Sequence, residues 1–138
     1  MVLLVLLPGC SEPPPDEERI QQRIDAMVEA VANKKTGDAL EPVHDDFLGN
    51  EHIRKANLRG MILLHNRRHK HLHVFVHNVE IELDDNREAT VRCHVILAGR
   101  NELVPEQGRV LKVTSQWKFI EDDWYVINAS WKDPLLQR

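Results

Sequence analysis

Cysteine is scarce in this sequence, with only Cys10 and Cys93 among 138 residues. Cys10 lies in an N-terminal segment of low complexity, whereas Cys93 lies within a regular apolar alternation, so we do not expect the two to form a disulfide. This scarcity excludes a small scaffold held together by cross-links. A chain of this length, with 42% hydrophobic residues, is long enough to bury a core of its own as one domain.

An excess of positive charge is also missing. Lysine and arginine number 18 against 22 aspartates and glutamates, so the net charge is −4 and the pI is about 6.0. Nucleic-acid-binding domains are usually basic, and the short run Arg67–Lys70 (RRHK) does not change this balance. We therefore predict no nucleic-acid partner. The sequence also lacks an HExxH zinc motif, a glycine-rich phosphate loop and a nucleophile motif, so we expect no cofactor.

Long hydrophobic runs are absent as well. The apolar run Val2–Leu7 has only six residues, whereas a membrane-spanning helix needs about 20. Pro8 and Gly9 follow it, and a short apolar run that ends in small residues is typical of a secretory signal. The stretch Leu7–Cys10 (LPGC) resembles the lipobox of bacterial lipoproteins, in which the cysteine is lipid-modified and becomes the new N-terminus. The alternative is an N-terminal segment in which this cysteine stands by chance.

The lipobox resemblance implies three parts: a signal peptide over 1–9, a tether over 10–18 and a folded domain over 19–138. The tether includes SEPPPDEE, which is proline-rich and acidic and therefore favours an extended segment outside any core. A lipid on Cys10 implies attachment to a membrane on the periplasmic side. In lipoproteins an aspartate after the cysteine commonly retains the protein at the inner membrane, and Ser11 here points instead to the outer membrane.

Helical periodicity dominates the first part of the domain. Apolar residues recur at spacings of three and four from Ile20 to Val31, which predicts an amphipathic helix that begins at Arg19 and ends at Gly37. A short second helix is predicted over 38–44. A third is predicted from an Asn50 N-cap to about His69.

From Leu72 onward the apolar period becomes two, which predicts strands over 72–83, 89–97, 111–119 and 124–131. In the first of these strands the apolar parity shifts by one, which indicates a β-bulge at His77–Asn78. We therefore predict an α+β domain with three N-terminal helices packed into a curved antiparallel sheet of four strands or slightly more. Such a sheet is expected to be cone-shaped and to enclose a cavity.

The order of these elements and the ending KFIEDDWYVINASW resemble the nuclear transport factor 2-like superfamily over Arg19–Asp133. That superfamily includes ketosteroid isomerase, scytalone dehydratase and other small-molecule enzymes. It also includes binding and assembly modules that catalyse nothing, so the resemblance does not by itself imply a reaction.

Enzymes of this superfamily place a basic Asp or His inside the cone, with Tyr or Asp donors beside it. Here the predicted inward strand positions are almost all apolar. The polar candidates for catalysis are His44, Asp45, Asp46 and His65, because a histidine beside a carboxylate can act as a general base. The alternative is that Asp45 and Asp46 solvate a turn and that His65 is an ordinary, partly buried histidine.

We expect His65, Trp117 and Trp124 to line the pocket of the cone. The function that we predict is a lipid-anchored, non-catalytic periplasmic module that binds a small apolar ligand or an envelope protein. The first alternative is an isomerase or dehydratase type of enzyme that acts in the same pocket.

Five of the eight histidines lie in the stretch HNRRHKHLHVFVHN. His71 and His73 are predicted on the outer sheet face, as is His94 of the next strand, and three such histidines suit zinc or copper. A metal-binding envelope protein is thus the second alternative, although solvated or interface histidines explain the same pattern. Phe75 and Ile96 lie on that face too, which favours a homodimer through it.

Overall fold

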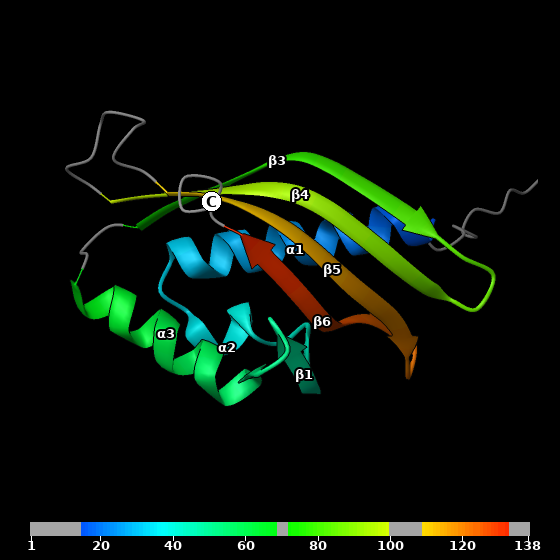
Figure 1. Ribbon diagram of the computed structural model, residues 1–138, viewed down its shortest axis with the longest axis horizontal. Coiled ribbons are helices and arrows are strands. Elements are labelled where there is room, and N and C mark those ends of the chain that lie inside the picture. Colours follow the sequence, from blue (N-terminus) through cyan, green and yellow to red (C-terminus); the bar gives the residue numbers. More distant parts are fainter. Residues whose placement is uncertain (1–14, 69–71, 100–108, 133–138) are drawn as a thin grey trace, which may run out of the picture.

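The computed structural model describes residues 15–68, 72–99 and 109–132. Three helices pack against a curved sheet (Figure 1), which confirms the predicted α+β class. The helices are α1 (Asp16–Ala32), α2 (Thr36–Ala39) and α3 (Lys55–Arg68). The strands are β1 (Val43–Gly49), β2 (Ile53–Arg54), β3 (Leu72–Leu83), β4 (Glu88–Gly99), β5 (Arg109–Ile120) and β6 (Asp123–Lys132). None of the helices in the described ranges is long and apolar enough to cross a membrane.

The sheet has six strands in the order β2-β1-β6-β5-β4-β3. Strands β3 to β6 form the predicted antiparallel meander. Strands β1 and β2 extend the sheet beyond β6. β1 pairs with β6 in parallel, so the sheet is mixed. α1 lies along the concave side of the long strands (Figure 1), and the core forms between this helix and the sheet.

The predicted bounds of the second helix, 38–44, are wrong, because α2 covers only Thr36–Ala39. The helix ends at Ala39, and Val43 already belongs to β1. Pro42 disfavours continuation of a helix because it lacks a backbone N–H donor and its ring clashes with the preceding turn. Val43 and Phe47 enter the core from β1.

The third helix also begins later than predicted, at Lys55 and not after Asn50. Asn50 and Glu51 have positive φ angles of 46° and 72°, so they form a left-handed turn between β1 and β2. The side chain of Asn57 instead accepts a hydrogen bond from the backbone N–H of Arg54, at 2.8 Å. Asn50 thus forms a turn and not the predicted helix cap, because asparagine favours both positions.

Two β-bulges bend the long antiparallel strands β3 to β6 in the described ranges. The register of β3 on β4 shifts between His77 and Glu80, and Asn78 has a φ of 56°, which confirms the bulge that the change of parity predicts. A second shift occurs in β6, where Val126 pairs with Trp117 but Asn128 pairs with Gln116, so that Ile127 is the extra residue. Each extra residue increases the local twist of its strand, and this curvature opens space beneath the sheet.

Gly49 lies where β1 passes under the indole of Trp131. A β-carbon at this position would lie 2.6 Å from Cη2 and 2.7 Å from Cζ3 of Trp131. Because such distances require one of the two groups to move, we predict that Gly49→Ala lowers the free energy of unfolding by about 1–3 kcal/mol. Urea unfolding measures this change.

Gly60 provides the matched control, because a β-carbon there meets nothing within 4 Å and the residue lies inside α3. Gly60→Ala is expected to raise the free energy of unfolding by about 0.5–1 kcal/mol. Equal effects of the two substitutions would contradict the contact proposed for Gly49.

Candidate ligand-binding cavity

An apolar cavity of about 270 Å³ lies between α1 and the concave face of the sheet. The side chains that line it come from α1, α3 and the sheet. Met27 and Val31 of α1 form one side, Leu58 of α3 another, and Trp117 and Trp131 line it from β5 and β6. The remaining described lining residues are Ile24, Val28, Val43, Phe47, Val74, Val76, Val91, Cys93, Val95, Val113, Ser115, Val126 and Ala129. The cavity is therefore suited to apolar molecules.

Ser115 is one of only two lining residues, among those described, with a polar side chain. Its hydroxyl donates a hydrogen bond to the carbonyl oxygen of Val91 at 3.3 Å and accepts one from Nε1 of Trp117 at 2.9 Å. Both partners belong to the protein, so the hydroxyl serves to orient the buried indole of Trp117. The serine has no adjacent base among the described lining residues that would activate it as a nucleophile.

Cys93 is the second polar lining residue, and its thiol is half-buried. Burial raises the pKa of the Cys93 thiol above its ordinary value. The thiol is therefore protonated at neutral pH, whereas a reactive cysteine needs the thiolate form. Cys93 contributes a soft, apolar surface to the cavity.

Of the three residues that the sequence suggests for the pocket, the structure separates the two tryptophans. Trp117 lines the cavity, whereas Trp124 does not and is instead completely buried, with 0% of its surface exposed. The indole N–H of Trp124 donates a hydrogen bond to Asp16 at 3.2 Å, and its ring packs edge-on against Phe119. His65 belongs to α3, but its side chain lies outside the described residues.

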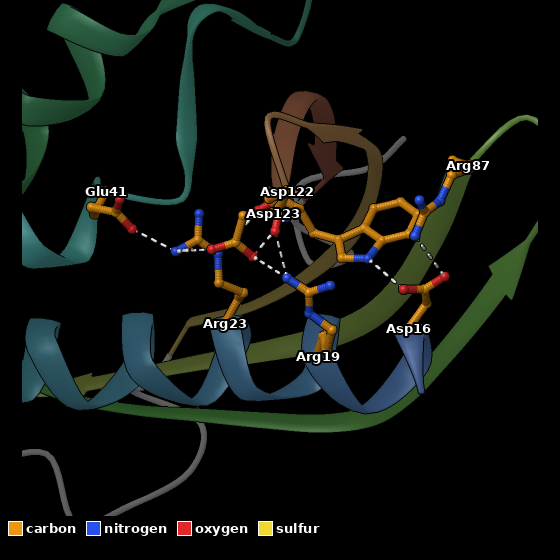
Figure 2. A network of polar contacts seen from close by, with 8 residues as sticks. Asp16, Arg19, Arg23, Glu41, Arg87, Asp122 and Asp123 are labelled. Atoms are coloured by element: carbon orange, nitrogen blue, oxygen red, sulfur yellow. Dashed lines mark hydrogen bonds and ion pairs between the residues drawn. The ribbon is translucent and has the colours of Figure 1, made fainter. Parts of the chain in front are cut away.

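A network of charged side chains connects α1 to the turn between β5 and β6 (Figure 2). Arg23 of α1 donates to the carbonyl oxygen of Trp124 at 3.0 Å and forms ion pairs with Glu41 and Asp123. One turn earlier, Arg19 donates to the carbonyl oxygen of Asp122 at 2.6 Å. The helix is thereby fixed to the β5–β6 turn. No local pattern in the sequence predicts this contact, because the arginines and the turn are about 100 residues apart.

Phe119 adds an aromatic contact to this network. The guanidinium groups of Arg87 and Arg19 lie 3.6 Å and 5.3 Å from the centre of its ring. Arg87 also forms an ion pair with Asp16 at 3.6 Å. These contacts connect the β3–β4 turn to the first turn of α1, because Arg87 precedes β4 directly.

The candidate catalytic residues of β1 do not line the cavity. His44, Asp45, Lys55, Arg59 and Tyr125 instead border a separate polar cleft of about 430 Å³. Asp45 pairs with Lys55 at 3.3 Å, and the ring of His44 lies edge-on to that of Tyr125.

Asp46 is not among the residues that border this cleft, and its side chain is fully exposed. Its backbone N–H donates to Nδ1 of His44 at 3.0 Å, whereas the carboxylate lies 3.9 Å from the same nitrogen. This pair forms a local turn contact at the surface and not a buried acid–base pair.

On the outer face, the strand register differs from the arrangement expected for a metal site. His94 pairs with His77, and its Nδ1 lies 3.3 Å from Nδ2 of Asn78. His73 pairs with Ala98, four residues further along β4, which corresponds to about 13 Å. The register therefore does not bring His73 and His94 together.

His71 and the side chain of His73 lie outside the described residues, and within the described ranges no group of three His, Cys, Asp or Glu side chains could hold a metal ion. Phe75 is exposed and Ile96 half-buried on the same face, and a homodimer through it stays a prediction.

Removal of the Ser115 hydroxyl tests how the cavity wall is fixed. Ser115→Ala leaves the buried N–H of Trp117 without a partner, so we predict a loss of about 1–3 kcal/mol in the free energy of unfolding. Ser130→Ala, at an exposed position of β6, should change it by no more than about 0.5 kcal/mol. Urea unfolding compares the two, and a negligible effect at Ser115 would show that the indole does not depend on this hydroxyl.

No protein-family model matches the chain, and no curated protein matches it. Solved structures do match it closely in shape. A protein of unknown function with a cystatin-like fold from Nostoc punctiforme superposes with a TM-score of 0.69 at 18% identity, covering 88% of this chain and 96% of that one. A nuclear transport factor 2-like protein from Cytophaga hutchinsonii has a TM-score of 0.69 at 15% identity, with coverages of 87% and 99%.

A putative scytalone dehydratase from Novosphingobium aromaticivorans is also similar, with a TM-score of 0.69 at 11% identity and coverages of 85% and 83%. The chain thus has the nuclear transport factor 2-like fold, a cone of helices and curved sheet. At these identities the likeness shows the fold alone, and the fold accommodates both catalytic and non-catalytic proteins.

Proposed function

We propose that this protein is a lipid-anchored periplasmic module that binds a small apolar ligand in its cone without transforming it. The observation that carries the proposal is the lining of the cavity. Apolar side chains from α1, α3 and the sheet surround it. The polar groups of its described lining side chains are a hydroxyl with two protein partners, a protonated thiol and the indole N–H groups of Trp117 and Trp131. A volume of about 270 Å³ is just below the roughly 300–1,000 Å³ of typical ligand sites, which favours a small molecule.

An enzyme in the same cone is the alternative, because a putative scytalone dehydratase shares the fold. General acid–base catalysis needs a titratable group within reach of the bound molecule. The lining residues that the structure describes offer no carboxylate or histidine, and the candidates of β1 border the polar cleft instead. Recovery of a chemically altered ligand after incubation with the protein would favour the enzyme.

Filling the cavity tests the proposed ligand site. Ala129 of β6 lines the cavity, whereas the next residue, Ser130, is exposed. We predict that Ala129→Phe weakens binding of the uncharged fluorophore N-phenyl-1-naphthylamine by about tenfold or more, because the added ring takes up the space for it. Ser130→Phe adds the same ring outside the cavity and should leave the affinity unchanged, as measured by fluorescence titration.

Cys93 provides a second readout on the unmodified cavity. Because its thiol lines the same space, bound fluorophore should slow its alkylation by a maleimide in a Cys10→Ser background. Unprotected alkylation, together with equal affinities of the two phenylalanine variants, would place the fluorophore elsewhere and contradict the proposal.

The lipid anchor rests on the stretch Leu7–Cys10 and the tether residues 11–14 after it, all outside the described residues, whereas the acidic residues Asp16, Glu17 and Glu18 form the first turn of α1. We predict that Cys10→Ala abolishes incorporation of radiolabelled palmitate and moves the protein from the membrane fraction to the soluble fraction of lysed cells. Cys93→Ala should leave both properties unchanged. Labelling that persists without Cys10 would contradict the anchor.

A further inference from the structure

Helix α3 exposes large apolar side chains to solvent. Met61, Leu63 and Leu64 are 44–48% exposed, and they make up half of the six large hydrophobic residues that are exposed in the described ranges. α3 packs on β1, β2 and α2, and Leu58 and Ile62 provide its contact with the core. At 100° per residue, these two side chains point to one side of the helix, and the three exposed ones cover much of the rest. We call Met61, Leu63 and Leu64 the outer face of α3.

The same helix concentrates positive charge. Its sequence, KANLRGMILLHNRR, holds one lysine and three arginines and no acidic residue. The helix therefore has a formal charge of +4, and the rest of the chain has 14 basic and 22 acidic residues, a charge of −8. The helix dipole favours cations at the C-terminal end, which explains Arg67 and Arg68 but not Arg59 or the exposed apolar residues.

We propose that the outer face of α3 inserts into the surface of an anionic phospholipid membrane. Apolar side chains bordered by cations fit the boundary between headgroups and acyl chains, where leucines enter the hydrocarbon and arginines reach the phosphates. Arg59 and Arg67 are exposed on this helix and available for that contact. The negative charge of the lipid complements a helix that is positive on an otherwise acidic protein.

The distribution of the apolar residues favours a membrane over a protein groove. A helix that docks in a groove presents a narrow stripe with spacings of three, four and seven residues. Met61 and Leu64 follow such a spacing, but Leu63 lies about 100° away from Leu64 around the helix. A fluid lipid surface accommodates this broad distribution without a fixed register.

Membrane contact would also place the cavity close to the bilayer. Leu58, on the opposite side of α3, lines the cavity, so one helix diameter, about 10–12 Å, separates the two. The membrane contact itself rests neither on the lipid at Cys10 nor on a ligand in the cone.

Vesicle flotation of the full chain with Cys10→Ser tests this contact without a lipid anchor. We expect the protein to bind phosphatidylglycerol vesicles and to bind phosphatidylcholine vesicles much more weakly, with binding to the anionic vesicles reduced by salt. The double variant Leu63→Ser/Leu64→Ser should bind at least about tenfold more weakly. Arg59→Ser/Arg67→Ser should lose the preference for anionic lipid.

Leu83→Ser is the matched control, because this leucine is 42% exposed and is the last residue of β3, whose C-terminal end lies far from α3 (Figure 1). It should leave vesicle binding unchanged. Equal binding by the Leu63/Leu64 variant and its parent, for example through the N-terminal apolar run, would overturn the proposal. Absence of vesicle binding by the parent would also overturn the proposal, and an acidic protein would then be the expected partner of the outer face of α3. Fluorophore binding in the cone, measured on the same variants, should not change, so the two proposals fail separately.

Discussion

The attachment of α1 to the β5–β6 hairpin is the contact on which the cone depends. Ile20 and Trp124 are both fully buried where the helix meets the hairpin, and the indole N–H of Trp124 bonds to Asp16 in the first helical turn. Arg19 and Arg23 secure the same junction through backbone carbonyls and Asp123. The cavity lies further along the helix, where residues of α1 from Ile24 to Val31 line it together with the sheet.

Polar and apolar chemistry are separated across β1. Val43 and Phe47 line the cavity, whereas His44 and Asp45 border the polar cleft, which Val43 also touches. The register of β1 on β6 shifts between Val43 and Leu48, so the residues between them do not follow simple alternation, and Asp45 borders the same cleft as its neighbour His44. A carboxylate in the cavity would be costly unless it was paired, so an apolar lining and a nearby polar surface are the stable arrangement.

α3 occupies an unusual position in this fold because it serves two surfaces at once. Leu58 and Ile62 complete the core and the cavity wall, while the outer face of α3 leaves large apolar side chains in water. Exposed apolar groups near clustered cations are typical of a contact surface. The membrane contact proposed for this helix and the ligand site proposed for the cone thus lie on opposite sides of the same element.

The periodicity of the apolar residues by itself determined much of the secondary structure of this protein. The spacing of Ile20, Ile24 and Met27 predicts α1, the alternation around Val91 predicts β4, and the change of parity after Val76 predicts the β3 bulge. These features are local, because the period of the apolar residues directly reflects the geometry of the backbone that must bury them.

Only the tertiary structure decided the remaining features. β1 is a strand because β6 offers it an edge to pair with, and the bulge at Ile127 depends on the register with β5. The separation of His44 from the cavity and the pairing of His77 with His94 likewise depend on residues distant in the chain. Pairing and burial are relations between segments, and the pattern within one segment does not specify its partner.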